Sequence, residues 1–101
     1  MIRVFTAKEP NVITLTIDGQ LGGEYVESLE MSTNEALGEH KPVHLFLRNV
    51  SHIDERGRTL LAHLAAKGVQ LSASGVYSSY IVDEIRQDLT RRFQSLRLPH
   101  A

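Results

Sequence analysis

The segment Val43–Gly68 constrains the fold most, because it combines a strand pattern with a helix pattern. Val43–Leu47 is an almost continuous apolar run, which is typical of a central strand covered on both faces. The mostly polar segment Asn49–Asp54 predicts a turn. A helix is predicted over Glu55–Lys67, and Asp54 is well placed to cap its first turn. A buried strand that leads directly into a helix is the building unit of α/β sheets.

The rest of the chain continues this alternation of strands and helices. Each predicted strand is short, and each predicted helix repeats its apolar residues at helical spacing. The order predicts a single α/β domain whose mixed, mostly parallel sheet starts with an antiparallel hairpin and has helices packed on it. The other predicted strands are Ile2–Thr6, Val12–Ile17 and Val69–Ser72; the other helices are Glu24–Leu37 and one from Ser78 or Ser79 to Phe93, with Ile81, Ile85, Leu89, Phe93 and Leu96 on its buried face.

Composition restricts the classes of partner. The 101 residues suit one domain, 1–101, whose tail 97–101 is expected to fray. A formal net charge of −1 gives no general attraction for nucleic acid or an anionic membrane. No apolar run is long enough for a membrane span. The absence of cysteine excludes disulfides and thiolate metal sites and fits a reducing cytoplasm.

The start of the second predicted helix carries an unusual set of charges. A helix N-terminus has unpaired amides and a partial positive charge, so it favours anions such as Asp54 and Glu55. Arg56 and Arg58 are unfavourable in the same turn, which suggests another use for them. An alternative is that both arginines are simply exposed and screened by salt.

The sequence around this turn resembles the signature of STAS domains, which occur in sulfate transporters and anti-sigma-factor antagonists. The matching residues are Asp54, Gly57, Leu60 and Leu61 after an apolar strand. The resemblance extends over about Val12–Leu96 and implies a small α/β unit with helices on a mixed sheet.

The resemblance also implies a role for the position before the glycine. In anti-sigma-factor antagonists of this family, a partner kinase phosphorylates a Ser or Thr there, and the added negative charge breaks the complex. Arg56 occupies this phosphoacceptor position and has no hydroxyl. The implied function is therefore partner binding without the usual switch. Ser51 and Thr59 are the nearest hydroxyls, and a turn serine and a helix threonine are their simplest interpretation.

The same helix offers a face for docking. At about 100° per residue, one side is predicted to point to the sheet and the other to solvent. The resemblance places the partner interface on this turn, on the outer side of the helix and on the glycine-rich loop before the first helix; a plain solvated face is the alternative. The predicted inner residues are Gly57, Leu60, Leu61, Leu64, Ala65 and Gly68, and the predicted partner-binding residues are Asp54, Glu55, Arg56, Gly57, Arg58, Thr59, Ala62, His63 and Ala66, with Gln20, Leu21 and Gly22 from the loop.

Other chemistries have weaker support. The loop Asp18–Gly23 matches neither common phosphate-binding glycine motif, so a tight turn is the better interpretation. His52 and Asp54 with a nearby hydroxyl do not form a nucleophile motif, so no catalytic residue is predicted. No metal and no cofactor is predicted, because the histidines lack metal-ligand spacing; they are His40, His44, His52, His63 and His100.

The sequence thus predicts a cytoplasmic, non-enzymatic module that binds a protein partner, similar to anti-sigma-factor antagonists that act in bacterial signalling and transcription regulation. The expected partner is an anti-sigma factor or a switch kinase with an ATPase-type fold. The alternative is an accessory STAS subunit of a membrane lipid-transport ATPase. Such subunits carry a Thr in the loop at Asp54, which is missing here unless Thr59 substitutes for it.

Overall fold

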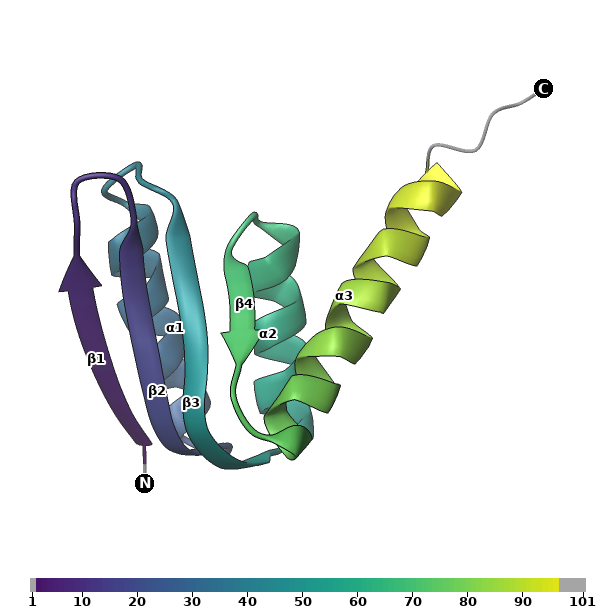
Figure 1. Ribbon diagram of the computed structural model, residues 1–101, viewed down its shortest axis with the longest axis horizontal. Helices are drawn as coiled ribbons and strands as arrows, with labels where there is room; N and C mark the ends of the chain where they lie inside the picture. Colours follow the sequence, from purple (N-terminus) through teal and green to yellow (C-terminus); the bar gives the residue numbers. More distant parts are fainter. Residues whose placement is uncertain (1, 97–101) are drawn as a thin grey trace.

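The computed structural model describes residues 2–96, with side chains to residue 91. It forms one α/β unit in which strands and helices alternate, as predicted (Figure 1). The predicted tail, 97–101, lies outside the described residues. The strands are β1 (Ile2–Lys8), β2 (Ile13–Leu21), β3 (Val43–Ile53) and β4 (Gln70–Ala73), and the helices are α1 (Tyr25–Leu37), α2 (Glu55–Ala66) and α3 (Val76–Leu96).

The four strands form one mixed sheet in the order β1-β2-β3-β4. β1 and β2 are antiparallel and joined by a tight turn in which the Glu9 amide donates to the Val12 carbonyl. β2 pairs with β3, and β3 with β4, in parallel. The predicted hairpin and the predicted parallel crossovers are therefore confirmed.

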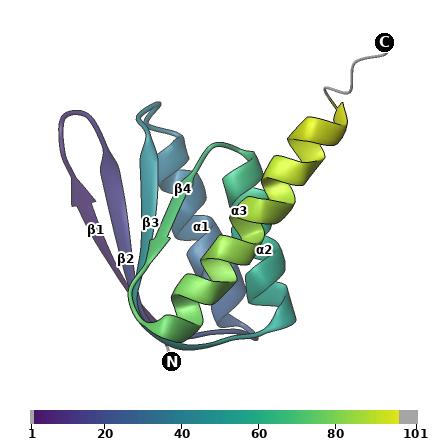
Figure 2. The same cartoon turned by 45° about the vertical axis from the view of Figure 1, so that its right-hand side comes forward.

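Helices cover only one face of this sheet. α1 and α2 lie behind the strands in Figure 1, and α3 lies beside β4 and runs away from it (Figure 2). The prediction that the central strand is covered on both faces is wrong, because His44 and Phe46 of β3 are only half-buried on the other face. Alternate residues of β2 and β3 form the core with the inner faces of the helices. The core includes Ile13, Leu15, Ile17, Val43, Leu45, Leu47, Leu29, Leu61, Leu64, Val82 and Ile85.

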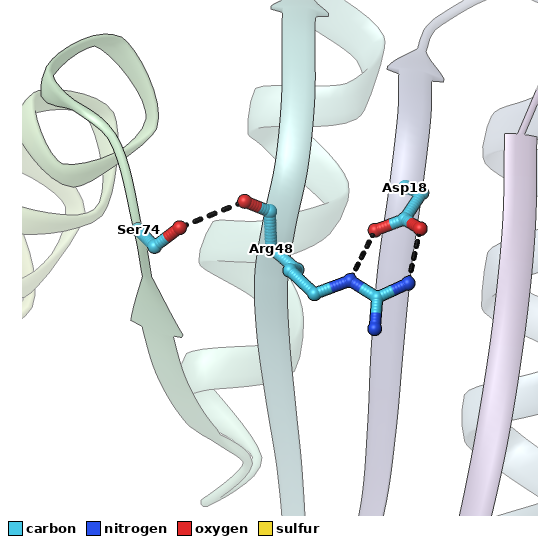
Figure 3. A network of polar contacts seen from close by, with 3 residues as sticks. All are labelled: Asp18, Arg48 and Ser74. Carbon is cyan, nitrogen blue, oxygen red and sulfur yellow. Dashed lines mark hydrogen bonds and ion pairs between the residues drawn. The ribbon is translucent and has the colours of Figure 1, made fainter.

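Polar and aromatic side chains gather on the open face. Asp18 of β2 and Arg48 of β3 form a two-point ion pair, with Arg48 Nε 2.9 Å from Asp18 Oδ1 (Figure 3). The Ser74 hydroxyl donates to the Arg48 carbonyl at 2.8 Å, and the guanidinium lies 5.3 Å from the ring centre of Phe5. The hydrogen bonds from Arg48 hold the pKa of Asp18 below its usual value. This cluster ties the middle of β3 to β1, to β2 and to the residue that follows β4.

β2 and β3 extend further than predicted. The segment Asn49–Asp54, expected to be a turn, continues β3 to Ile53. The expected tight turn over Asp18–Gly23 is also wrong for its first four residues, because Asp18–Leu21 continue β2. Register shifts in this pair follow Ile17 and Gly19, so the polar stretch remains in the sheet. A bulge of this kind adds residues to a strand without ending it. The strand therefore continues through a segment whose composition is typical of a turn.

α3 begins at Val76, two or three residues before the predicted start. Its described buried residues are Ser78, Ile81, Val82 and Ile85, while Leu89 is half-buried. The predicted burial of Phe93 and Leu96 concerns side chains outside the described ones. The buried Ser78 hydroxyl donates to the Val50 carbonyl at 2.9 Å, which fixes the start of α3 under β3.

Candidate functional site

The turn between β3 and α2 is held by Asp54, which caps α2 as predicted. Its Oδ1 accepts the Gly57 amide at 2.8 Å, and its Oδ2 accepts the Gly23 amide at 2.9 Å. The Asp54 amide in turn donates to the Leu21 carbonyl at 3.1 Å. These hydrogen bonds favour the ionised carboxyl and lower the pKa of Asp54, the Gly57 contact most. Asp54 therefore joins the β2–α1 loop to the start of α2.

Two glycines allow this close approach. A Cβ at Gly57 would lie 2.6 Å from the Leu21 carbonyl oxygen, and a Cβ at Gly22 would lie 2.8 Å from Asp54 Oδ2. Both distances are shorter than van der Waals contact permits. Gly57 thus has a packing reason for being a glycine, which does not depend on a partner.

Two of the predicted partner-binding residues are not at the surface. Leu21 is fully buried and Gly57 is buried under the loop, so they support the turn from beneath and offer nothing to a partner directly. Leu21 is inside because β2 extends to it and its side chain falls on the core side of the sheet. Gln20 is exposed and Gly22 is half-buried beside Asp54.

The two sides of α2 separate nearly as predicted. Four of the six predicted inner residues are buried, Ala65 is half-buried, and Gly68 is exposed because it follows the end of the helix. The predicted outer side is accessible throughout, with Ala62 half-buried. The exposed outer residues are Arg56, Thr59, His63 and Ala66.

A shallow groove lies on each side of this outer face. The groove toward α1 has a volume of about 520 Å³, and the groove toward α3 has a volume of about 440 Å³. Both include Glu55, Thr59 and His63 in their walls. The outer side of α2 is thus a ridge between two grooves. Ridges on the surface of another protein can pack into these grooves.

Each unexpected arginine of the first turn has an acidic neighbour on another helix. Arg56 lies 3.6 Å from Glu27 of α1, with both side chains largely exposed. Arg58 lies 2.7 Å from Glu84 of α3 and is the main cause of a lowered pKa of Glu84, to which Tyr80 also contributes by a hydrogen bond. The arginines therefore join α2 to both neighbouring helices. Sequence spacing alone gave no sign of these partners.

Tyr77 is a residue of the site that sequence reasoning missed. Its hydroxyl accepts the Ile53 amide at 3.0 Å and donates to the Ile53 carbonyl at 3.2 Å. It thereby holds the last residue of β3, next to Asp54, against the start of α3. The only signal in the sequence was a tyrosine at the beginning of a helix, which is too common to be informative.

The other predicted groups stay separate. Ser51 and Thr59 are exposed and lie on different elements. Within residues 2–96, no three His, Asp or Glu side chains are arranged to hold a metal ion. The helices in that range are also too short or too polar to cross a membrane.

Comparisons with known proteins identify the fold. No protein-family model matches this sequence, and no curated protein matches it. The structure of an anti-sigma factor antagonist from Mycobacterium paratuberculosis is similar with a TM-score of 0.74, covering 89% of this chain and 82% of that chain at 17% identity. A protein called Mglu is similar with a TM-score of 0.57 at 25% identity, covering 71% of this chain but only 19% of that one.

The class of fold follows from these likenesses. The chain has the α/β fold of an anti-sigma factor antagonist, which is the STAS-type fold that the Asp54 motif implied. At this identity the likeness establishes architecture, and function must be argued from the surface.

Proposed function

We propose that this protein is a non-enzymatic protein-binding module of the anti-sigma-factor antagonist type, acting in the bacterial cytoplasm in signalling and transcription control. The observation that carries the proposal is the accessible outer face of α2, next to the Asp54 turn, on a fold similar to that of a solved anti-sigma factor antagonist. The partner is an anti-sigma factor or a switch kinase with an ATPase-type fold.

The make-up of this face supports docking. Ala62 and Ala66 are small, so a partner helix can approach the backbone closely, and Thr59 and His63 offer polar groups at the rim of such a contact. The turn is held by Asp54 through two amides, so the surface is fixed before binding. A preformed surface loses less entropy on association.

Arg56 supports a module without the usual phosphoswitch. Its side chain is 61% exposed and faces Glu27, and it has no hydroxyl to accept phosphate. Binding is then controlled by the abundance of the partner or at another position. An in vitro kinase assay that gave stoichiometric phosphate on Ser51 or Thr59 would contradict this part of the proposal.

The test is capture of partners by tagged protein from the native host, followed by reconstitution with the purified partner. Arg56→Glu and Ala62→Arg alter the α2 face. Ala7→Arg is the control for the added charge, because Ala7 is an exposed alanine of β1, whereas Ala62 is a half-buried alanine of α2. We expect an ATPase-type kinase or anti-sigma factor that binds the wild type and the control, and binds both α2 variants more weakly by at least about tenfold.

Two results would redirect the assignment. Retention of a transport ATPase would favour an accessory subunit of a lipid-transport complex, with Thr59 in the place of the missing loop threonine. Equal binding of one partner by all variants would show that the docking surface lies elsewhere on the domain.

A further inference from the structure

We propose that the groove between α1 and α2 receives a basic, amphipathic helix of the partner protein. This inference rests on the proposed function and adds the chemistry of the partner. The groove has a volume of about 520 Å³ and runs beside the outer face of α2. Its lining residues are Val26 and Glu30 from α1, and Glu55, Arg56, Thr59, Leu60 and His63 from α2.

The floor of the groove is apolar. Val26 and Leu60 are each 6% exposed, so only a small part of each side chain reaches the surface. Both residues line the groove between α1 and α2, two helices that lie side by side (Figure 2). An apolar strip between two helices accommodates the apolar edge of a third helix, as in other helix-in-groove contacts.

The rim of the groove is acidic. Glu30 and Glu55 line it together with Arg56 and His63, and Glu27 lies just outside the lining, where it is paired with Arg56. Three carboxylates and one guanidinium therefore lie at or beside the groove. α1 contributes no cation, because Tyr25–Leu37 contains three glutamates and neither lysine nor arginine. Complementary charge on a partner steers it to the groove and disfavours acidic competitors. A helix with one apolar edge flanked by lysine or arginine meets both requirements.

The arginine that lines this groove is itself paired with an acid. Arg56 is 3.6 Å from Glu27, a distance typical of a weak, exposed ion pair. An incoming lysine or arginine can take the place of Arg56 at Glu27 at little cost, because both side chains are mostly exposed. Within the turn, Asp54 and Glu55 balance Arg56 and Arg58 in formal charge. The groove is acidic because α1 adds Glu30 to its lining and Glu27 beside Arg56.

The test uses a pair of synthetic helical peptides of about 14 residues with the same leucine edge, flanked by lysine in one and by glutamate in the other. Fluorescence anisotropy measures binding to the wild-type protein and to Glu30→Lys. Glu35→Lys is the matched control, because it makes the same change of charge on α1 at about 140° around the helix. Glu35 is not in the groove; it lies near Lys8, whose pKa is raised mainly by the hydrogen bond to Glu39 and to a smaller extent by the charge of Glu35.

We expect the lysine peptide to bind the wild type and Glu35→Lys alike, and Glu30→Lys at least about tenfold more weakly. Binding should weaken as salt rises from about 50 to 300 mM, and it should shift the methyl NMR signals of Val26 and Leu60. Preference for the glutamate peptide would overturn the proposal, as would equal weakening in both variants.

The same measurements separate this inference from the proposed function. If Ala62→Arg abolishes capture of the native partner while Glu30→Lys leaves it unchanged, the α2 face binds the partner and the acidic groove does not. If sedimentation instead shows concentration-dependent self-association that Glu30→Lys abolishes, the occupant is a second copy of this chain and the separate basic partner is excluded.

Discussion

The Asp54 carboxylate accepts the Gly23 amide at 2.9 Å, across 31 positions of sequence. With its second oxygen it caps α2 through Gly57. One side chain therefore performs two tasks, ending the β2–α1 loop and starting α2. The shape of the proposed docking surface depends on both.

Loss of this double contact should lower stability. Asp54→Ala removes the cap and releases the loop, so we expect the Tm to fall by roughly 4 to 8 °C. Asp54→Asn keeps one side-chain oxygen as an acceptor and should lose less. Circular dichroism melting curves measure the effect. Asp83→Ala is the control, because that carboxylate is exposed on α3 and its ion pair among the described residues is a long one, 3.9 Å from Arg86. An equal fall in Tm for Asp83→Ala would show that the cap contributes no more than an exposed carboxylate.

The stabilisation by Asp54 should depend on pH in a defined direction. Amide hydrogen bonds hold its pKa below the ordinary value of 3.8 in the folded protein. A lowered folded pKa gives stability that is complete above the unfolded pKa and is lost as pH falls through the folded pKa. The difference in Tm between wild type and Asp54→Asn should therefore be constant near neutral pH and shrink below about pH 4. A difference that grew on acidification would contradict this assignment.

Adding a single methyl group at Gly57 should strain the turn. The Cβ of Gly57→Ala would meet the Leu21 carbonyl at 2.6 Å and the Leu21 Cγ at 2.9 Å, and Leu21 is fully buried and cannot move away. We expect a loss of about 1–3 kcal/mol in the free energy of unfolding by urea, even though alanine favours helices. Thr59→Ala, an exposed change in the same helix, should stay within about 0.5 kcal/mol of wild type.

The Tyr77 hydroxyl should contribute to stability through its two hydrogen bonds to Ile53. Tyr77→Phe removes both hydrogen bonds to Ile53 and should cost about 1 kcal/mol of stability. Hydrogen exchange at the Ile53 amide should become faster, since its acceptor is lost. Tyr80→Phe provides the comparison, because that ring is 60% exposed and its hydroxyl contacts only Glu84 among the described residues. Unchanged exchange at Ile53 would show that the contact is not formed in solution.

Much of the fold was predictable because the spacing of the apolar residues and the residues that start and end the helices indicate the same elements. In α2 the residues Leu60, Leu61 and Leu64 recur at helical spacing and are all buried, while Thr59 and His63 are exposed. The Asp54 cap was also predictable, since an aspartate directly before a segment with helical apolar spacing is typical of a helix N-cap.

The strand ends and the open face were not predictable from composition. Asn49–Ile53 contains polar residues typical of a turn, but Val50 and Ile53 are buried and pairing with β2 continues through a register shift. His44 and Phe46 suggested a strand covered on both sides, because a histidine and a phenylalanine tolerate partial exposure as well as burial. Whether a helix covers a face of the sheet depends on the path of the chain. The sequence of the strand alone does not show it.

The charges of the site were the least predictable feature. Local sequence pairs Asp54 and Glu55 with Arg56 and Arg58, which suggests a neutral turn. In the fold, Arg58 meets Glu84 of α3 and Arg56 meets Glu27 of α1. Partners on separate helices follow from tertiary packing, which short-range spacing rules do not describe.

The division of α2 into a buried side and an exposed side has an evolutionary consequence. Substitutions at Thr59, Ala62, His63 and Ala66 change the proposed docking surface, while the leucines beneath keep the helix on the sheet. Such a domain can change its binding repertoire by drift at a few positions with little effect on its stability. Proteins encoded by duplicated copies of the gene can therefore come to bind different partners while they still share the same backbone structure.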